Sequence, residues 1–395
     1  MTQHDTRRQP PDEPNDTDTF AAEINARLQD RIRAAIAESA GLLPFDRFME
    51  LALYAPGLGY YVAGAEKFGP DGDFTTAPEL SPLFGRCIAN QCAEVLERIP
   101  EAEILEFGAG SGALAIQILG RLAESDALPK RYRILEPSPE LRRRQRDRIQ
   151  QRLPHLIDRC EWLDGLPERM QGIVIANEVL DAMPVHRFRL DDAGEPLEVC
   201  VGEREGAFTD VDAPIRSPGL AERIATLQAE GFAQTPGYAS EINLRLAPWL
   251  SALSDVLERG LALLIDYGYS RSAYYQSDRS MGTLMCHYRH QAHEDPYRHI
   301  GLQDITAHVD FTAVAEAGLG AGFELAGFTT QAHFLIGCGI DQLLSESPDA
   351  LEQTLAAKQL LLPTEMGERF KVMGLDKGMS ESWRGFSVRD LSDRL

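Results

Sequence analysis

The sequence lacks the cysteine patterns and the long apolar runs that mark several common classes of protein. None of its six cysteines forms a CxxC pair or the paired spacing of a zinc site. No apolar run approaches the ~20 residues needed to cross a bilayer, so we expect no stable membrane insertion. The thiols are predicted to be reduced and mostly buried in a cytoplasmic protein. The cysteines are Cys87, Cys92, Cys160, Cys200, Cys286 and Cys338.

The N-terminal segment also lacks the signals that direct proteins out of the cytoplasm. MTQHDTRRQPPDEPNDTDTF contains no apolar stretch of the kind found in a secretory signal. Its acidic residues are spread throughout, which argues against a mitochondrial presequence. Because the segment is polar and rich in charge, we expect residues 1–19 to form a disordered tail.

Basic residues are scarce relative to acidic ones. The chain has 39 Lys and Arg against 61 Asp and Glu, a formal net charge of -22. Such a chain repels nucleic acid and anionic membranes at long range and attracts basic partners, so we expect no nucleic-acid partner. Solubility alone also accounts for an acidic surface. At 44% hydrophobic residues, the sequence can still bury a sizeable core.

The order of apolar patterns predicts four regions. After the tail, residues 20–100 contain predicted helices at 20–40, 44–54 and 79–98, with a Gly-, Pro- and aromatic-rich loop over 55–85. Residues 101–340 form the core, and residues 341–395 form a helical and mixed extension. Within the core, residues 185–212 predict an antiparallel hairpin and residues 213–260 a mostly helical segment, so that about 185–260 is an insertion.

Strand and helix patterns alternate through the core. Short apolar runs that alternate with helices indicate βαβ units and a mostly parallel sheet, a Rossmann-like α/β fold. The predicted strands are 102–107, 132–137, 172–178, 261–268 and 323–330, and the predicted helices between them include 112–122, 138–152 and 311–321.

A glycine-rich turn, GAGSGA, follows the first core strand directly. A dinucleotide fingerprint reads GxGxxG, but here the third glycine, Gly112, comes one residue early after Gly108 and Gly110. An acid two residues before the first glycine, Glu106, is typical of class I methyltransferases that use S-adenosylmethionine. That cofactor has no phosphate and needs close approach of the backbone rather than bare helix amides. The pattern therefore favours S-adenosylmethionine over NAD.

Acidic side chains stand at the ends of the next two core strands. Glu136 ends the second strand, where nucleotide-binding folds place a carboxylate against the ribose hydroxyls. Asn177, Glu178 and Asp181 follow the next strand, and a helical turn would place the two acids on one face. Two carboxylates beside a methyl donor suit an amine or a guanidinium, which they can align and deprotonate.

Seven segments resemble the MidA family of S-adenosylmethionine-dependent methyltransferases, which is related to the arginine methyltransferase of mitochondrial complex I assembly. The resemblance runs from about residue 40 to the end of the chain. The matching segments are GDFTTAPELSPLFG (72–85), ILEFGAGSGALA (104–115), YRILEPSPELRRRQ (132–145), ANEVLDAMPVHRF (176–188), LLIDYGY (263–269), GTLMCHYRHQAHEDPYRHIGLQDITAHVDF (282–311) and ERFKVMGL (368–375).

The resemblance implies a class I methyltransferase fold with a seven-stranded sheet, S-adenosylmethionine as donor and a protein arginine as acceptor, on a core subunit of respiratory complex I. It implies that the glycines line the cofactor, that Glu136 takes the ribose and that Asn177, Glu178 and Asp181 face the acceptor. It leaves roughly residues 1–40 dispensable for chemistry. The segment that would close over the cofactor consists of Asp73, Phe74, Thr75, Thr76, Pro78 and Glu79.

Several polar residues have more than one interpretation. Arginine methyltransferases commonly use two acids from different segments, and Glu241 is our candidate for the second. Asp266 either lines the acceptor side or stabilises the turn that follows it. Asp304, Thr306, His308 and Asp310 alternate along an extended segment, so they share one face if it is a strand, but Asp310 alone could cap the next helix.

The histidines of residues 286–299 have spacings that fit no standard metal site, so we predict no metal. A substrate loop, or a solvated basic loop, is the better interpretation. These histidines are His287, His290, His293 and His299.

Three alternatives to a protein arginine methyltransferase remain at this point. They are a methyltransferase for small molecules or for other protein sites, a dinucleotide oxidoreductase, and an assembly factor that binds S-adenosylmethionine without turnover. The sequence also leaves a homodimer open.

Overall fold

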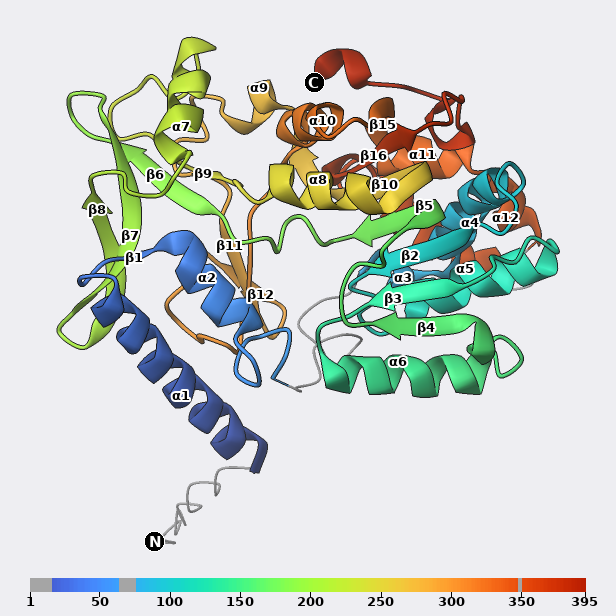
Figure 1. The fold of residues 1–395 in the computed structure, drawn as a ribbon, viewed down its shortest axis with the longest axis horizontal. Helices are drawn as coiled ribbons and strands as arrows, with labels where there is room; N and C mark the ends of the chain where they lie inside the picture. Colours follow the sequence, from blue (N-terminus) through green and yellow to red (C-terminus); the bar gives the residue numbers. More distant parts are fainter. Residues whose placement is uncertain (1–15, 64–75, 347–349) are drawn as a thin grey trace, which may run out of the picture.

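The structure, a computed structural model, describes residues 16–63, 76–346 and 350–395. Two parts lie side by side in Figure 1: a large mixed sheet covered by helices, and a smaller antiparallel sheet that packs with the N-terminal helices. The large sheet is the core, and the smaller sheet belongs to the predicted insertion. The functional cavity described below draws residues from both parts.

The central sheet has seven strands in the order β4-β3-β2-β5-β10-β16-β15, with the short β14 beside β10. Its strands are parallel except β16, which is antiparallel to both of its neighbours. The predicted mostly parallel seven-stranded sheet is therefore confirmed. The strands are β2 (Glu103–Phe107), β3 (Tyr132–Leu135), β4 (Cys160–Leu163), β5 (Met170–Asn177), β10 (Leu257–Tyr269), β14 (Val309–Asp310), β15 (Glu324–Thr330) and β16 (Phe370–Lys377).

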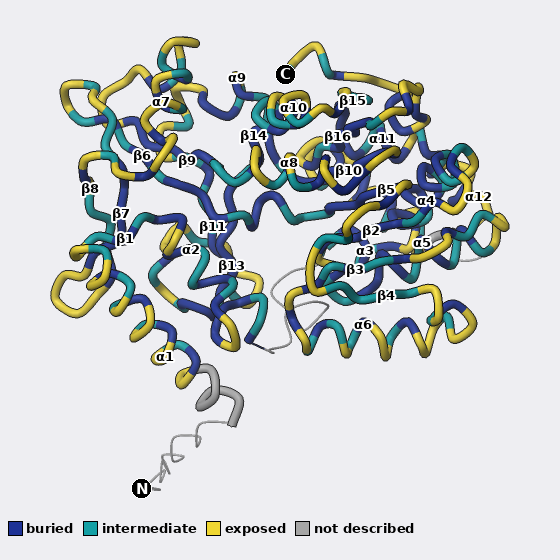
Figure 2. Tube along the Cα trace, in the orientation of Figure 1, coloured by how far each residue is buried: buried dark blue, intermediate teal, exposed yellow. Residues whose placement is uncertain are grey.

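Helices cover both faces of this sheet, which explains why its strands read as continuous apolar runs. Ile173 and Ile175 of β5 pack in one core with α4 (Pro82–Leu96) and α5 (Ala113–Glu124). Val174 and Ala176 point to the other face and pack with α8 (Leu246–Val256) and α10 (Phe311–Gly320). Figure 2 shows the buried positions concentrated on the central strands.

The chain reverses direction across the sheet at β2. From β2 the chain runs outward to β3 and β4, and it then returns to the opposite side of β2 as β5. In open α/β sheets, ligands bind at the carboxyl ends of the strands that flank such a switch point. The glycine turn after β2 and the acids after β5 meet at this place.

Two strands of the central sheet differ from the prediction. Residues 341–395 were expected to be a helical and mixed extension, but β16 inserts between β10 and β15 and its residue Val372 is fully buried. The half-buried edge strand β4 was not predicted at all. The remaining elements are α3 (Ala77–Leu80), α6 (Pro139–Arg152), α9 (Arg271–Tyr274), α11 (Gln331–Gly337), α12 (Ile340–Glu346), α13 (Ala350–Leu361), α14 (Met366–Arg369) and 3-10 turns at Ile157–Arg159, Arg384–Phe386 and Ser392–Arg394.

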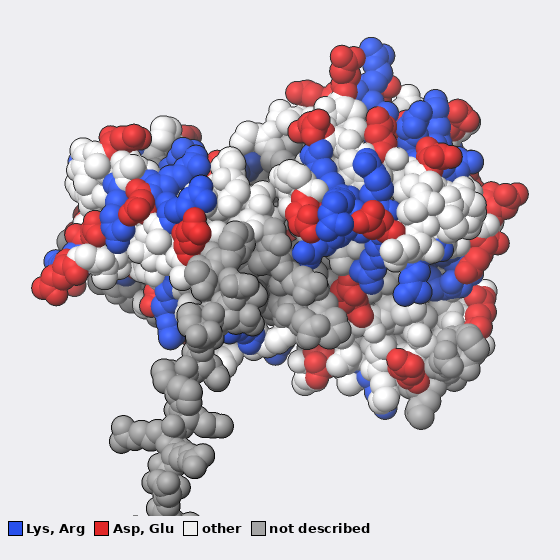
Figure 3. Space-filling view, turned by 90° about the horizontal axis from the view of Figure 1, so that it is seen from below, with Lys and Arg blue, Asp and Glu red and all other residues white. Residues whose placement is uncertain are grey.

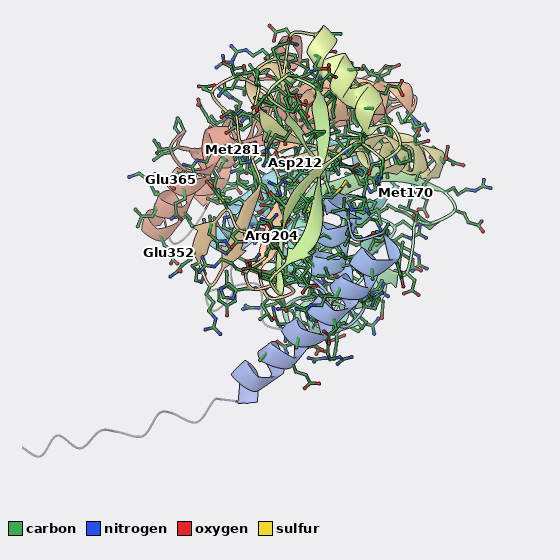
Figure 4. The ribbon with its side chains drawn as sticks, turned by 90° about the vertical axis from the view of Figure 1, so that its left-hand side faces the viewer. Met170, Arg204, Asp212, Met281, Glu352 and Glu365 are labelled. Carbon is green, nitrogen blue, oxygen red and sulfur yellow. The ribbon has the colours of Figure 1, made fainter. Side chains whose placement is uncertain are left out.

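The smaller sheet has five antiparallel strands in the order β1-β7-β6-β9, with β8 paired to β7, and the insertion supplies all of them except β1. The predicted hairpin over 185–212 is present as three consecutive strands, and helix α7 packs above them. Figure 4 looks onto this sheet, with Arg204 of β7 and Asp212 of β8 labelled. The elements are β1 (Leu43–Pro44), β6 (His186–Leu190), β7 (Pro196–Arg204), β8 (Ala207–Ala213), α7 (Leu220–Ala229) and β9 (Ala239–Ile242).

The N-terminal helices are part of the folded structure. Helix α1 (Asp16–Glu38) buries Leu28 and Ile32 completely in a core that it shares with α2 (Phe45–Tyr54) and with a small three-stranded sheet. Removal of α1 would expose this core, so α1 contributes to the fold, and the expectation that residues 1–40 are dispensable for chemistry stays a prediction. The small sheet consists of β11 (Met285–Tyr288), β12 (Gln291–His293) and β13 (Asp304–Thr306), in the order β12-β11-β13.

The surface carries charges of both signs at close range. On α6, Arg143 pairs with Glu140 and Asp147, and Figure 3 shows such interleaved charges on the face seen from below. Pairs of this kind on an exposed helix contribute little to stability, but they keep the helix soluble. In the part of the chain that the structure describes, no helix has the length and apolar character needed to cross a membrane.

Candidate active site

A cavity of about 240 Å³ opens at the carboxyl ends of β2, β3, β5 and β10. Its described lining contains five carboxylic acids and no Lys, Arg or His, so it favours positively charged ligands. The lining residues are Tyr54, Tyr61, Thr76, Pro78, Glu106, Phe107, Gly108, Ala109, Gly110, Ser111, Ala113, Leu114, Leu135, Glu136, Pro137, Leu141, Asn177, Glu178, Val179, Asp181, Ala182, Tyr267 and Asp304.

The glycine turn forms one wall of this cavity. Gly108 and Gly110 line it with φ angles of 58° and 51°, a left-handed conformation that glycine adopts without strain. Gly112, with φ of 79°, is instead the N-cap of α5 and is not among the lining residues; a Cβ there would lie 3.5 Å from Gln145. The turn thus brings bare backbone to the cavity through its first two glycines, and the third shapes the start of the helix.

Glu106 lies at the base of the turn and is almost completely buried. The hydroxyl of Tyr132 donates a hydrogen bond to Glu106 Oε2 at 2.8 Å. Burial nevertheless raises the pKa of Glu106 to about 7. The acid therefore lies at the cavity as predicted, and its neighbour across β2 and β3 holds it in place.

Glu136 ends β3 and is held from two sides. The Ser138 amide donates to its Oε1 at 3.0 Å, and the Gln145 side-chain amide donates to its Oε2 at 3.1 Å. Gln145 also donates to the Gly110 carbonyl at 2.9 Å and accepts from the Trp162 indole at 2.9 Å. Gln145 was not predicted, because a Gln inside a very basic helix gives no signal in the sequence. Gln145 fixes Glu136 and the glycine turn relative to each other.

The predicted cofactor lid is only partly described. Asp73, Phe74 and Thr75 lie outside the described residues, whereas Thr76 and Pro78 line the cavity. Glu79 does not line it.

The Glu79 carboxylate instead accepts from the hydroxyl of Ser111 in the glycine turn and, at 3.0 Å, from Arg148 of α6. These bonds lower the pKa of Glu79 against the opposing effect of its burial. Glu79 therefore fastens the segment before α4 to the turn rather than touching the ligand.

The acids after β5 face the same cavity but do not form the helical turn that their spacing suggested. Glu178 has φ of 54°, which excludes an α-helix and turns its carboxylate toward the cavity. The side-chain amide of Asn177 donates to Glu178 Oε1 at 3.2 Å. Burial, together with the charge of Asp181, raises the pKa of Glu178 to about 8, and burial raises that of Asp181 to about 6. A bound cation would let both acids ionise.

Asp266 supports this acidic turn from behind. Its Oδ2 accepts from the amides of Leu180 and Asp181 at 3.0 and 3.2 Å, and its Oδ1 accepts from the Tyr267 amide at 2.9 Å. Asp266 is not among the described lining residues of the cavity, and the turn that it holds through Leu180 and Asp181 is the one after β5 rather than the turn that follows Asp266 itself. The Tyr267 hydroxyl in turn donates to Asp181 Oδ2, so β10 orients the carboxylate of Asp181.

A second tyrosine-acid pair faces the cavity from the small sheet. The Tyr61 hydroxyl lies 2.9 Å from both carboxylate oxygens of Asp304, and the ring of Tyr61 stacks on Tyr54 with centroids 5.5 Å apart. The sequence had placed Asp304 on a polar face, but neither tyrosine was identified as a site residue. Their only signal was an aromatic-rich loop.

Glu241 lies apart from the main cavity. It is buried in β9, where its Oε2 accepts from the Thr283 amide at 2.9 Å and it lines a separate small pocket of about 30 Å³ with His308 and Asp310. Asp310 caps α10 by accepting from Thr312 and Ala313 amides. The face predicted from Asp304 to Asp310 is therefore divided between two cavities, and Glu241 is not brought together with Glu178 and Asp181.

The residues of the cavity fit S-adenosylmethionine. Asn177 Oδ1 and Asp181 Oδ1 are buried acceptors with no hydrogen-bond partner among the described residues, which suits a ligand that brings N–H donors. Glu136 lines the cavity with a carboxylate, the kind of group that accepts hydrogen bonds from ribose hydroxyls, beside the apolar Leu135 and Leu141. The acidic lining complements a sulfonium. Asn177, Glu136 and the first two glycines would therefore hold the cofactor.

Residues 87–329 match the family model of S-adenosyl-L-methionine-dependent methyltransferases. The chain belongs to this family. Its cofactor is S-adenosylmethionine, and a dinucleotide oxidoreductase is excluded.

Solved structures agree with the assignment of this chain to the methyltransferase family. A protein of Burkholderia thailandensis, described as a methyl transferase and solved with S-adenosyl-homocysteine bound, is 41% identical, with a TM-score of 0.91 over 97% of this chain and 99% of that one. A second structure from the same organism, without that description, gives 0.89 at 41% identity over the same shares. The chain therefore has the class I α/β fold, which it shares with these two structures.

Curated relatives carry a narrower description. The mitochondrial protein arginine methyltransferase NDUFAF7 homolog of Drosophila melanogaster is 28% identical over 94% of this chain and 90% of its own length. The mouse mitochondrial protein arginine methyltransferase NDUFAF7 is 28% identical over 86% of this chain and 82% of its own.

Proposed function

We propose that this methyltransferase transfers a methyl group to a guanidinium nitrogen of an arginine in a protein substrate. One observation carries the proposal: Glu178 and Asp181 face the cofactor cavity together, and no basic side chain lies among the described lining residues. Both acids have raised pKa values that a bound cation would lower. A guanidinium is a planar cation that carboxylates can hold through paired hydrogen bonds.

The acids would perform two tasks. S-adenosylmethionine, when bound, supplies an electrophilic methyl group on its sulfonium. Glu178 and Asp181 would orient the acceptor nitrogen toward that group, because positioning contributes most of the rate in a displacement of this kind. As the nitrogen forms its bond to the methyl carbon, the bond from that carbon to the sulfonium sulfur would break and leave the neutral thioether S-adenosyl-homocysteine. The nitrogen would lose one proton, which a carboxylate accepts and passes to solvent. The guanidinium keeps its positive charge throughout.

The names of the curated relatives support a protein arginine as the acceptor. We propose further that the arginine lies on a core subunit of respiratory complex I, as the family resemblance suggests. A small-molecule acceptor is the competing proposal, since the acidic lining alone would also accept a free cationic metabolite.

A comparison of arginine methylation tests the proposal. The gene for this protein is deleted, and the proteins of the deletion strain and of the parent are digested and analysed by mass spectrometry for methylated arginines. We expect at least one methylarginine, on a complex I core subunit, to disappear in the deletion and to return with the wild-type gene. An unchanged set of methylarginines would overturn the arginine assignment.

The same strain tests the two acids directly. Complementation with Asp181→Asn should leave the methylarginine absent, while isothermal titration shows that the variant binds S-adenosylmethionine within about twofold of wild type. A protein that binds the cofactor without turnover would instead show no methylarginine that depends on the wild-type gene.

A further inference from the structure

Asp304 is an acid from a second segment of the chain that lines the same cavity as Glu178 and Asp181. Asp304 belongs to β13 of the small sheet, far from β5 in the chain, and is itself 4% exposed. Tyr61 holds both of its oxygens at 2.9 Å, and the Ile305 amide donates to Oδ1 at 2.9 Å. We infer that Asp304, oriented by Tyr61, is the second acid that binds the acceptor guanidinium; the inference rests on the proposed arginine chemistry.

Two hydrogen bonds tie the segments around Asp304 to the turn that carries Asp181. The Ala307 amide, just after β13, donates to the Asp181 carbonyl at 3.0 Å. The Tyr54 hydroxyl donates to the Ala182 carbonyl at 3.0 Å. The segments that carry Asp304 and Tyr54 are therefore both tied to the turn that carries Asp181. The two acids therefore line one cavity, although Asp304 lies in β13 and Asp181 lies in the turn after β5.

The two acids are arranged in the same way. In each case a tyrosine hydroxyl donates to the carboxylate: Tyr267 to Asp181, and Tyr61 to Asp304. Such a donor stabilises the ionised form of the acid and fixes the orientation of its carboxylate. The stacked rings of Tyr54 and Tyr61 add an aromatic surface to the same wall. Aromatic faces attract a cation and suit the flat guanidinium better than a compact ammonium.

Other buried acids near the site are engaged elsewhere. Glu241 accepts from Thr283 outside the main cavity, Asp266 accepts three backbone amides, and Asp310 caps α10. Beyond the cofactor acids Glu106 and Glu136, the acids of the described lining are Glu178, Asp181 and Asp304. The second acid predicted from a different segment is therefore Asp304, and Glu241 is not that residue.

The test compares Asp304→Asn with Glu241→Gln. The acceptor is the lysate of the deletion strain with radiolabelled S-adenosylmethionine, and methylarginine is counted after acid hydrolysis. Asp304→Asn should lower kcat/KM for the acceptor about tenfold or more, because it removes a charge from a charge-assisted hydrogen bond, while cofactor affinity stays within about twofold. Glu241→Gln should remain within about twofold of wild type in both measurements.

A second pair of variants covers the case in which Asp304→Asn fails to fold. Tyr61→Phe should raise the acceptor concentration needed for half-maximal rate several-fold with little change in kcat. The matched control is Tyr297→Phe, which removes a tyrosine hydroxyl that donates to Asp210 away from the cavity. It should leave the acceptor kinetics unchanged.

The outcomes separate this inference from the proposed function. If wild-type protein forms methylarginine and both Asp304→Asn and Tyr61→Phe match it, Asp304 is not the second acid, although arginine methylation stands. An equal loss in Glu241→Gln would likewise overturn the assignment. If wild-type protein forms no methylarginine, the proposed function fails, and a guanidinium site at Asp304 fails with it.

Discussion

Glu178 combines an uncommon backbone conformation with a buried carboxyl group. Its φ of 54° is unusual for a residue other than glycine, and its pKa is raised to about 8. Such features persist when the surrounding fold enforces them, and they concentrate at functional sites. Here Asp266 enforces the turn through two backbone amides. Burying the carboxyl group of Glu178 in this conformation therefore lowers the stability of the folded protein.

Replacing Glu178 with Gln should make the protein more stable above neutral pH. In the folded state the Glu178 carboxyl keeps its proton up to a pH of about 8. In the unfolded state its pKa has the ordinary value of 4.5, so the carboxyl has lost that proton well below pH 8. Stability therefore falls as pH rises between these values, and Gln removes that loss. We expect Glu178→Gln to unfold about 2 °C higher than wild type at pH 8, and at the same temperature at pH 4. Differential scanning fluorimetry at both pH values is the measurement, and a lower midpoint at pH 8 would contradict it.

Methyl transfer should depend on pH through the same acids. With pKa values raised to about 8 and about 6, Glu178 and Asp181 are increasingly ionised as the pH rises from 6 to 9. Since the ionised forms bind the cation, kcat/KM for the acceptor should rise by about tenfold or more over this range. Cofactor affinity at each pH serves as the control. A rate that is flat from pH 6 to 9 would show that these acids do not titrate in the free enzyme.

At the scale of elements, Gln145 is one of the side chains that fasten α6 beside the cofactor cavity. Gln145 contacts the Gly110 carbonyl, the Glu136 carboxylate and the Trp162 indole. Figure 2 shows the rest of α6 alternating between buried and exposed positions, as expected of a helix that covers an edge. The position of the cofactor acid therefore depends on a neutral amide.

Gln145→Leu should weaken cofactor binding without unfolding the protein. It keeps most of the side-chain volume but leaves the Gly110 carbonyl and the Trp162 indole without their partner, so we expect about a tenfold loss of S-adenosylmethionine affinity. The matched control is Gln331→Leu, which removes an equally buried amide that donates to the Leu360 carbonyl away from the cavity. Titration calorimetry on both variants decides the matter, and equal affinities would count against the role of Gln145.

The sequence predicted the elements whose patterns are local. Residues 173–176 and 261–265 are unbroken apolar runs because helices cover both faces of the sheet, so these strands were recognisable. By contrast, the short β4 lies half-buried at an edge, and no periodicity marks it. Strand β16 follows helical residues, and it becomes a strand by pairing with β10 and β15, which are distant in the chain. The local sequence pattern of residues 370–377 does not predict pairing with distant strands.

The same distinction applies to the site at the scale of the whole molecule. The acids after β2, β3 and β5 were predicted, because a parallel sheet brings strand ends to one edge. Relating Glu241 and Asp304 to this cavity required knowing how β9 and β13 fold against the core, and local spacing does not contain that information. Tyr54 and Tyr61, from the N-terminal part of the chain, were missed for the same reason. The cavity joins residues of the common fold, such as Glu178 and Asp181, to residues of the N-terminal part and of the small sheet.

Disrupting β16 should unfold the whole molecule rather than loosen one end. Val372 is fully buried between two neighbouring strands, so Val372→Asp places a charge in the main core. We expect loss of cooperative unfolding and of cofactor binding, measured by circular dichroism and calorimetry. Glu365→Ala, at an exposed position that Figure 4 labels, is the control and should behave as wild type. Retained cooperative unfolding in Val372→Asp would show that β16 is peripheral.

The position of β16 near the end of the chain also determines when the central sheet can be completed during translation. On the ribosome the chain emerges from its N-terminus, so the strands that carry the cofactor acids appear long before residues 370–377. Until then β15 has no hydrogen-bonding neighbour in the sheet and β10 has an open edge. The nascent enzyme therefore carries its catalytic residues on an unfinished sheet, and its core closes only when translation is nearly over.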